Sequence, residues 1–157
     1  ATSLHLKDRN LPKKIVVRKD KDLLTELDSD IRMAFETLMN YQNKENLNCF
    51  LNEIQPGRLL ANKNFLMSNW REKGYFLSEE PLNGVGTLTQ PVLIILGKQD
   101  SICGYKDHFF LLEKFPNATF SILDGAGHML QIEKRKIVQE LIKDWLIRSN
   151  PVCELSE

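Results

Sequence analysis

Two side chains that could perform acid–base chemistry follow two apolar, β-rich runs. Asp100 ends the phrase "LGKQD" after the run 91–97, and His128 ends the phrase "LDGAGH" at the close of the run 118–125. If these runs are neighbouring parallel strands, their carboxyl ends lie roughly 5 Å apart at one edge of the sheet. A carboxylate that accepts the Nδ1 proton of a histidine fixes its tautomer and leaves Nε2 free to take a proton from a nucleophile or a water. The pattern therefore predicts a carboxylate–imidazole pair.

Each member of this pair also has an ordinary structural interpretation. Asp100 could be a turn residue or a helix cap, because Asp is favoured in both roles. His128 could be a histidine that satisfies loop backbone groups. Asp124, on the second run, is the main rival for pairing with His128. The strand-end positions and the glycines before His128, which allow a sharp turn, favour the Asp100–His128 pair.

Other candidate residues lack this context. Ser101 and Cys103 closely follow Asp100 and either could be proposed as a nucleophile, but neither lies on a strand-to-helix elbow. Cys103 is more typical of a small buried hydrophobic residue. His108 falls in an expected helix and is predicted to lie at the surface, and His5 has no comparable surroundings.

The elements that must position the pair form a strand–helix–strand–helix pattern. Strands are predicted over 91–97 and 118–125, and helices over 105–115 and 133–149. This order implies two parallel strands joined by a right-handed crossover. The predicted apolar stripes are Tyr105, Phe109 and Leu112 on the first helix, and Val138, Leu141, Ile142 and Trp145 on the second.

The part of the chain before Pro91 is predicted to be mainly helical. Helices are expected over 29–42, over 44–54 with a stop at Pro56-Gly57, and over 62–74 with an end at Gly74. The first of them carries one apolar face, made by Ile31, Ala34, Phe35 and Leu38. The strip 13–20 could be a short strand or an extended connection, and 79–91 is predicted to be a linker.

Together, the phrases "PVLIILGKQDSICGY", "FPNATFSILDGAGHMLQIE" and "IVQELIKDWL" resemble the C-terminal part of an α/β-hydrolase over 91–147. In that family a "GxxD" turn carries the acid of the catalytic triad, and a "GxGH" turn carries its histidine. The resemblance implies an α/β fold in which a helical cap region with its linker, 1–90, precedes the last part of the core, 91–150, and a tail, 151–157. It also implies that Asp100 is the orienting acid and His128 the general base, with no metal and no cofactor.

The sequence departs from the family pattern at the nucleophile. It contains no "GxSxG" elbow and no histidine–glycine oxyanion loop, both of which precede the cap in the family. We therefore expect the chain to be the C-terminal portion of an enzyme for a small ester or amide, inactive alone, whose missing N-terminal half of the core supplies a serine. Two alternatives stay open: a related hydrolase with an Asp nucleophile, of the dehalogenase or epoxide hydrolase type, and a truncated, non-catalytic binding module.

Composition limits the other classes of function. The 157 residues carry 21 basic and 21 acidic side chains, so no basic excess indicates nucleic acid or a membrane surface as a partner. No apolar stretch approaches the ~20 residues needed to span a bilayer. Three cysteines without paired spacing are typical of a reducing compartment, and the cytoplasm is expected. The edge of the run 91–97 could pair with a second copy, which would make a homo-oligomer.

Overall fold

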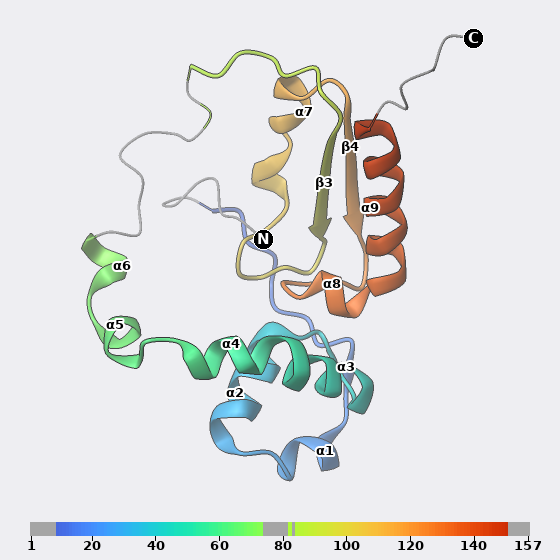
Figure 1. Cartoon of the computed structure of the whole chain (residues 1–157). Coiled ribbons are helices and arrows are strands. Elements are labelled where there is room, and N and C mark those ends of the chain that lie inside the picture. The colour runs from blue at the N-terminus through green and yellow to red at the C-terminus, as the bar shows by residue number, and fades with distance from the viewer. Residues whose placement is uncertain (1–8, 74–81, 83, 151–157) are drawn as a thin grey trace.

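The computed structural model describes residues 9–73, 82 and 84–150, which form a helical layer and a small sheet with its own helices (Figure 1). The strands of the sheet run toward the helical layer, so their carboxyl ends face it, and the short helix α8 lies between (Figure 1). No helix among these residues is both long and apolar enough to cross a bilayer. The predicted tail, 151–157, lies outside the described residues, and the division of the chain into domains stays a prediction.

The helical layer is built from short elements. Its helices are α1 (Lys21–Thr25), α2 (Ser29–Leu38), α3 (Lys44–Cys49), the π-helix η1 (Phe50–Ile54), α4 (Gln55–Leu60), α5 (Lys63–Met67) and α6 (Trp70–Lys73). Two short strands, β1 (Arg18–Lys19) and β2 (Tyr41–Gln42), pair in parallel beside them. β1 confirms the prediction of a short strand or extended connection within 13–20.

The core of this layer is apolar and closed. Phe35 of α2 and Phe50 of η1 are fully buried and meet edge to face, with ring centroids 5.4 Å apart. The predicted face of α2 is confirmed, because Phe35 lies in this core and Ile31, Ala34 and Leu38 pack against it. The α2 N-cap is Asp28, whose side chain accepts a hydrogen bond from Asp30 N and so satisfies one open backbone group of the first turn.

Three predicted helices in this layer have wrong bounds. The helix predicted over 29–42 ends at Leu38, because Met39 is extended, and Tyr41 and Gln42 form β2 instead. The helix that begins at Lys44 does not stop at Pro56-Gly57 but continues through η1 into α4. In η1 the N–H of Gln55 reaches back to Phe50 O, and Pro56 then lies in the first turn of α4, where a missing N–H costs nothing. The third predicted helix, 62–74, is split into α5 and α6 because Ser68 is extended, and its expected end at Gly74 lies outside the described residues.

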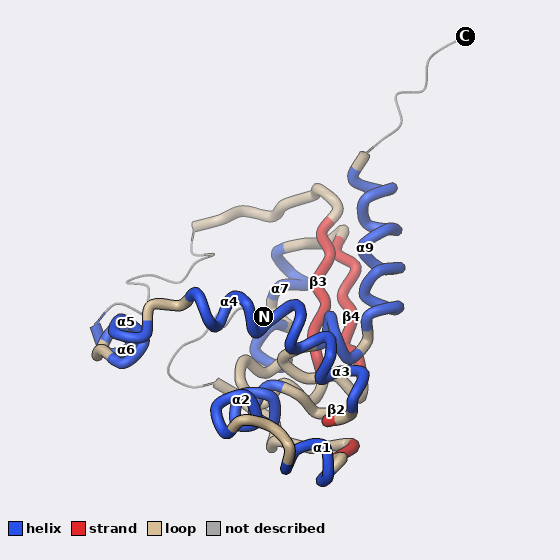
Figure 2. Tube along the Cα trace, turned by 60° about the horizontal axis from the view of Figure 1, so that its bottom comes forward, coloured by secondary structure: helices blue, strands red, loops and turns tan. Residues whose placement is uncertain are grey.

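The sheet confirms the predicted strands and their parallel pairing. β3 (Val92–Gly97) lies beside β4 (Ala118–Leu123), in a register that runs from Val92 opposite Ala118 to Gly97 opposite Leu123. Two views place α7 (Leu111–Lys114) and α9 (Arg135–Ser149) on opposite sides of the two strands (Figures 1 and 2). Residues 84–91, from the predicted linker, form no helix or strand.

The predicted helix 105–115 is interrupted, and its buried face differs from the prediction. A 3₁₀ turn, η2 (Lys106–His108), precedes α7. Because a 3₁₀ turn has three residues, it changes which side chains face inward. His108 and Leu111 are buried, whereas Phe109 and Leu112 are exposed. The surface position predicted for His108 is therefore wrong.

The last helix follows the predicted pattern closely. In α9, Val138 is buried and Leu141 and Trp145 are half-buried, while Ile142 is exposed. The indole Nε1 of Trp145 donates a hydrogen bond to Pro91 O at 2.9 Å and so fixes this helix to the start of β3. An extra short helix, α8 (Leu130–Glu133), lies between His128 and α9.

Candidate active site

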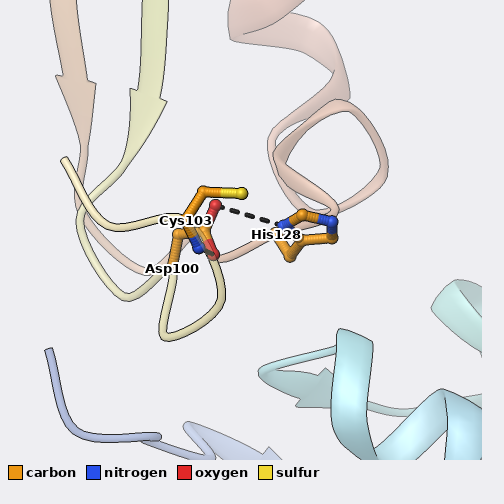
Figure 3. Close-up of side chains that lie close together, drawn as sticks. All are labelled: Asp100, Cys103 and His128. Atoms are coloured by element: carbon orange, nitrogen blue, oxygen red, sulfur yellow. Dashed lines mark hydrogen bonds and ion pairs between the residues drawn. The ribbon is translucent and has the colours of Figure 1, made fainter. Parts of the chain in front are cut away.

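Asp100 and His128 meet at the carboxyl ends of the two strands, as the sequence predicts (Figure 3). His128 Nδ1 lies 3.3 Å from Asp100 Oδ2. Asp100 is 1% exposed and the side chain of His128 is 20% exposed, so the carboxylate is shielded while part of the imidazole reaches solvent. The arrangement leaves Nε2 as the ring nitrogen that is not directed at the carboxylate.

Asp100 is both a turn residue and the partner of His128. Its Oδ1 accepts hydrogen bonds from the backbone N–H groups of Ile102, at 2.9 Å, and Cys103, at 3.0 Å. These two bonds hold the carboxylate in one orientation, with Oδ2 directed at the imidazole. Asp100 is therefore the turn residue that the sequence suggested, and its hydrogen bonds within the turn orient its carboxylate toward His128.

Glycines bring the histidine loop against the end of β3. Gly125 has a φ of +65°, a left-handed conformation that other residues rarely adopt. A Cβ atom at Gly97 would overlap the carbonyl oxygen of Gly127, so the two loops approach as closely as backbones allow. Gln99 links them further, because its N–H donates to Ala126 O at 2.9 Å and its Oε1 accepts from Ala126 N at 3.1 Å.

The surroundings of the pair favour the charged form of both side chains. The hydrogen bond with Asp100, followed by the contact with Cys103, raises the pKa of His128 to about 9, against an opposing effect of burial. Burial acts to raise the pKa of Asp100, but hydrogen bonds from His128, Cys103 N and Ile102 N outweigh it and lower the pKa below its ordinary value. The histidine is thus a strong base held in its protonated form.

Asp124, the rival carboxylate, does not pair with His128. Its side chain is 76% exposed and lies 3.4 Å from Lys98 Nζ. It also accepts a hydrogen bond from Gln99 Nε2 at 2.8 Å. These two contacts, the one with Gln99 first, lower the pKa of Asp124. Asp124 therefore lies at the exposed side of the turn, and Asp100 is the carboxylate that contacts His128.

Cys103 is a member of the cluster that sequence reasoning did not place there. It is buried, as predicted for a small hydrophobic residue, but its sulfur lies beside Asp100 and His128 (Figure 3). One side-chain donor atom from each of the three residues falls within 4.8 Å of the others. The spacing of three residues after Asp100 could have indicated this, because a tight turn returns the third residue to the side of the first.

Glu133 is a second missed residue, and it joins the histidine loop to the helical layer. Its Oε2 accepts from Gly127 N at 2.7 Å, and its Oε1 accepts from Asn40 N at 2.5 Å and Tyr41 N at 2.9 Å. The sequence presents Glu133 only as the start of a helix. Asn40 and Tyr41 are 93 and 92 residues away, so no local pattern could have indicated this link.

Lys14 supports the same junction from the other side. Its Nζ donates to Thr37 O, Met39 O and the Oδ1 of Asn40, at 2.9 to 3.0 Å. Burial lowers the pKa of Lys14, and the carboxylates of Glu133 and Asp100 act in the opposite direction. Ser101, which the sequence offered as an unlikely nucleophile, is half-buried and lines an open hollow with Lys14 and residues of α2.

Comparison with known proteins identifies the fold but no close relative. No protein-family model and no curated protein sequence matches the chain. The structure is similar to the crystal structure of an alpha/beta superfamily hydrolase from Oenococcus oeni PSU-1, with a TM-score of 0.76 and 20% sequence identity over 92% of this chain and 53% of that chain. A thermophilic esterase aligns at a TM-score of 0.46 and 19% identity, over 87% of this chain and 54% of that chain.

The described part of the chain therefore has part of an α/β-hydrolase fold, and the predicted fold class is confirmed. The chain spans about half the length of the solved structures it matches, with 53% and 54% of their residues covered.

Proposed function

We propose that Asp100 and His128 are the orienting acid and the general base of a hydrolase that cleaves a small ester or amide. The observation that carries this proposal is the 3.3 Å contact between His128 Nδ1 and Asp100 Oδ2, made between the ends of adjacent parallel strands. Ligand chemistry in parallel α/β sheets gathers at this end of the strands. The fold shared with the Oenococcus oeni hydrolase supports the same conclusion.

In the proposed mechanism the two ring nitrogens of His128 have different roles. Asp100 accepts the Nδ1 proton and stabilises the imidazolium, while Nε2 takes the proton of an attacking hydroxyl group and then returns it to the leaving group. The nucleophile is a serine on a strand-to-helix elbow, contributed by core strands that this sequence does not contain. No step of this mechanism requires a metal or a cofactor.

The high pKa of His128 gives the mechanism a pH dependence. A general base must start neutral, and a pKa of about 9 leaves the imidazole mostly protonated at pH 7. Catalysis through this residue should therefore increase from pH 7 toward pH 9. The limiting pKa should decrease in a Cys103→Ala variant, because the contact with Cys103 contributes to the shift.

The helical layer fits the role of a cap over this site. It lies across the carboxyl ends of β3 and β4 (Figure 1). Glu133 joins it to the histidine loop through Asn40 N and Tyr41 N. A substrate would then bind between the helical layer and the strand ends, where a cap excludes water and selects for size.

The test uses a polypeptide that contains this chain together with the proposed serine-bearing core strands. Replacing His128 with Ala, or Asp100 with Asn, should reduce kcat for a short p-nitrophenyl ester on the order of 10³–10⁴-fold. Asp124→Asn is the matched control, since this exposed carboxylate also follows a strand and should leave turnover unchanged. Near wild-type turnover in His128→Ala would refute the proposal.

The residue at the strand-to-helix elbow distinguishes a serine hydrolase from a related hydrolase with an Asp nucleophile. A serine that forms an acyl-enzyme, detected as a burst of p-nitrophenol, supports the proposed mechanism. An aspartate there, with an alkyl-enzyme intermediate formed from a haloalkane or an epoxide, would replace the serine mechanism while keeping both roles in this chain. Absence of any elbow would contradict catalysis altogether.

A further inference from the structure

We propose that Asp100, Cys103 and His128 form a binding site for Zn²⁺ or a similar divalent transition-metal ion. The three residues offer a carboxylate oxygen, a sulfur and an imidazole nitrogen, all within 4.8 Å of one another. Thiolate and imidazole are ligands that Zn²⁺ prefers, and a carboxylate commonly completes such a set. Metal binding at this site is a property separate from hydrolysis, because it requires no nucleophile.

The distances suit a tetrahedral ion after a small adjustment. With metal–ligand distances of about 2.0–2.3 Å, neighbouring ligands of tetrahedral zinc lie roughly 3.3–3.8 Å apart. His128 Nδ1 and Asp100 Oδ2 are already 3.3 Å apart. The remaining separations are at most 4.8 Å, so a shift of Cys103 Sγ by about 1 Å brings the set into range.

The surroundings hold the ligands in place before an ion arrives. The N–H groups of Ile102 and Cys103 bind Asp100 Oδ1, which leaves Oδ2 oriented for coordination. Such supporting hydrogen bonds tighten metal binding. Figure 3 shows the Cys103 sulfur, the Asp100 carboxylate and the His128 ring turned toward one another. The partial exposure of His128, at 20%, provides a path for the ion and a place for a water as fourth ligand.

Binding would reorganise the pair in a defined way. The ion accepts one lone pair each from the Cys103 thiolate, the His128 nitrogen and the Asp100 carboxylate, and the protons of the thiol and the imidazolium pass to solvent. The two negative ligands balance the charge of the ion. If the proposed function is correct, this breaks the Asp100–His128 hydrogen bond and Zn²⁺ inhibits hydrolysis. That consequence rests on the proposed function, whereas the site itself does not.

The test is a spectroscopic titration of the reduced 157-residue chain with Co²⁺, which reports on zinc sites. We expect an equimolar complex with a thiolate-to-cobalt charge-transfer band that Zn²⁺ abolishes. The band should be lost in Cys103→Ser, His128→Ala and Asp100→Asn. It should persist when the other two cysteines are replaced together, in Cys49→Ser/Cys153→Ser, and in His5→Ala, which removes a histidine outside the described residues. Circular dichroism without metal shows whether each variant is folded.

Every outcome decides the proposal. Absence of the band, its survival in Cys103→Ser, or its loss in the Cys49→Ser/Cys153→Ser variant overturns it. Retention of the band in His128→Ala or in Asp100→Asn shows that the thiol acts without the full set of three ligands and also overturns it. If Cys103→Ser does not fold, the wild-type chain gives the answer, because bound Zn²⁺ must slow iodoacetamide labelling of Cys103. No measurement here requires turnover, so failure of the metal site leaves the hydrolase proposal standing.

Discussion

The helical layer and the sheet bury apolar residues to different extents. In the helical layer, Phe35, Met39 and Phe50 are all 0% exposed. In the sheet every residue of β4 is only half-buried, and β3 reaches full burial only at Leu96 and Gly97. β3 contains the longest unbroken apolar run in the sequence, 92–96, yet the described part of the chain covers the two strands less completely than the helical core. The helical layer therefore has a closed core, which Ile132 of α8 completes, whereas the sheet is well covered only at one end.

That covered end is the one that carries the candidate site. Residues 125–127 and Asp100 are buried, and both apolar packing and polar contacts hold them: Ala126 packs with Leu130 and Val138. Glu133 joins the histidine loop to Asn40 and Tyr41, and Gln99 joins it to the turn after β3. The contrast teaches that the two regions differ in what is added to apolar packing. Packing dominates in the helical layer, whereas at the site directed hydrogen bonds supplement the packing of Ala126 and so fix the loops.

The sharpest test of the contrast compares one apolar residue from each region. Phe50→Ala should lower the free energy of unfolding by about 3–5 kcal/mol, because it removes a fully buried ring and its edge-to-face partner. Ile94→Ala, in the middle of half-buried β3, should cost about 1–2 kcal/mol, since less surface is buried there. Urea unfolding followed by circular dichroism measures both. Equal costs would show that the sheet is packed as tightly as the helical layer.

The ion pair gives the site end its own pH dependence. The pKa of His128 is raised from 6.5 to about 9, so its stabilisation is fully present below pH 6.5 and is lost as pH increases through 9. At about 1.4 kcal/mol per pH unit, this shift corresponds to an upper limit of about 3.5 kcal/mol. Asp100 contributes at the acid end of the pH range. Because its pKa is lowered in the folded chain, its stabilisation is present above pH 3.8 and is lost as the pH falls below that value.

Proton NMR of the His128 ring measures this directly. The resonance should titrate near pH 9 in the wild-type chain. In Asp100→Asn the titration should return toward 6.5, because the hydrogen bond with the Asp100 carboxylate, the main cause of the raised pKa, is then removed. Asp124→Asn should leave the titration unchanged, since Asp124 binds Gln99 and Lys98 instead. A titration near 6.5 in the wild-type chain would mean that the two side chains do not share a proton in solution.

Glu133 tests how much polar contacts add to the packing of Ile132 in holding the two regions together. Glu133→Gln keeps the shape but turns an amide group toward a backbone N–H of Gly127 or of the 40–41 segment, and we expect a loss of about 2–3 kcal/mol. Hydrogen exchange at Gly127 and Tyr41 should accelerate together. Glu140→Gln, on the exposed face of α9, is the matched control and should change neither. Faster exchange at Gly127 alone would show that the loop and the helical layer are independent.

The strands and the pair were predictable because both depend on local patterns. Apolar runs bounded by turn residues predict β3 and β4, and their order along the chain implies parallel pairing. Once that pairing is given, Asp100 and His128 must follow neighbouring strand ends. The apolar face of α2 was predictable for the same reason, since its period of 3.6 residues is visible in the sequence.

The features that the sequence did not predict depend on contacts between distant residues or on unusual turns. The π-turn of η1 carries the chain through Pro56, where proline chemistry normally predicts a stop. A single 3₁₀ turn was enough to bury His108 instead of Phe109. The role of Glu133 depends on partners more than 90 residues away, and such long-range contacts leave no trace in a local window.

Two glycines provide the finest comparison between the regions. Gly97→Ala places a Cβ against the Gly127 carbonyl, which must move, and we expect a cost of about 1–3 kcal/mol together with altered NMR shifts at His128. Gly57→Ala, in α4, meets no atom within 4 Å and should stabilise the chain by about 0.5–1 kcal/mol, because alanine favours helix. Thermal melts rank the two variants. If Gly97→Ala were neutral and His128 undisturbed, the close approach of the two loops would not be what positions the histidine, and the hydrogen bonds of Gln99 and Glu133 would have to do so alone.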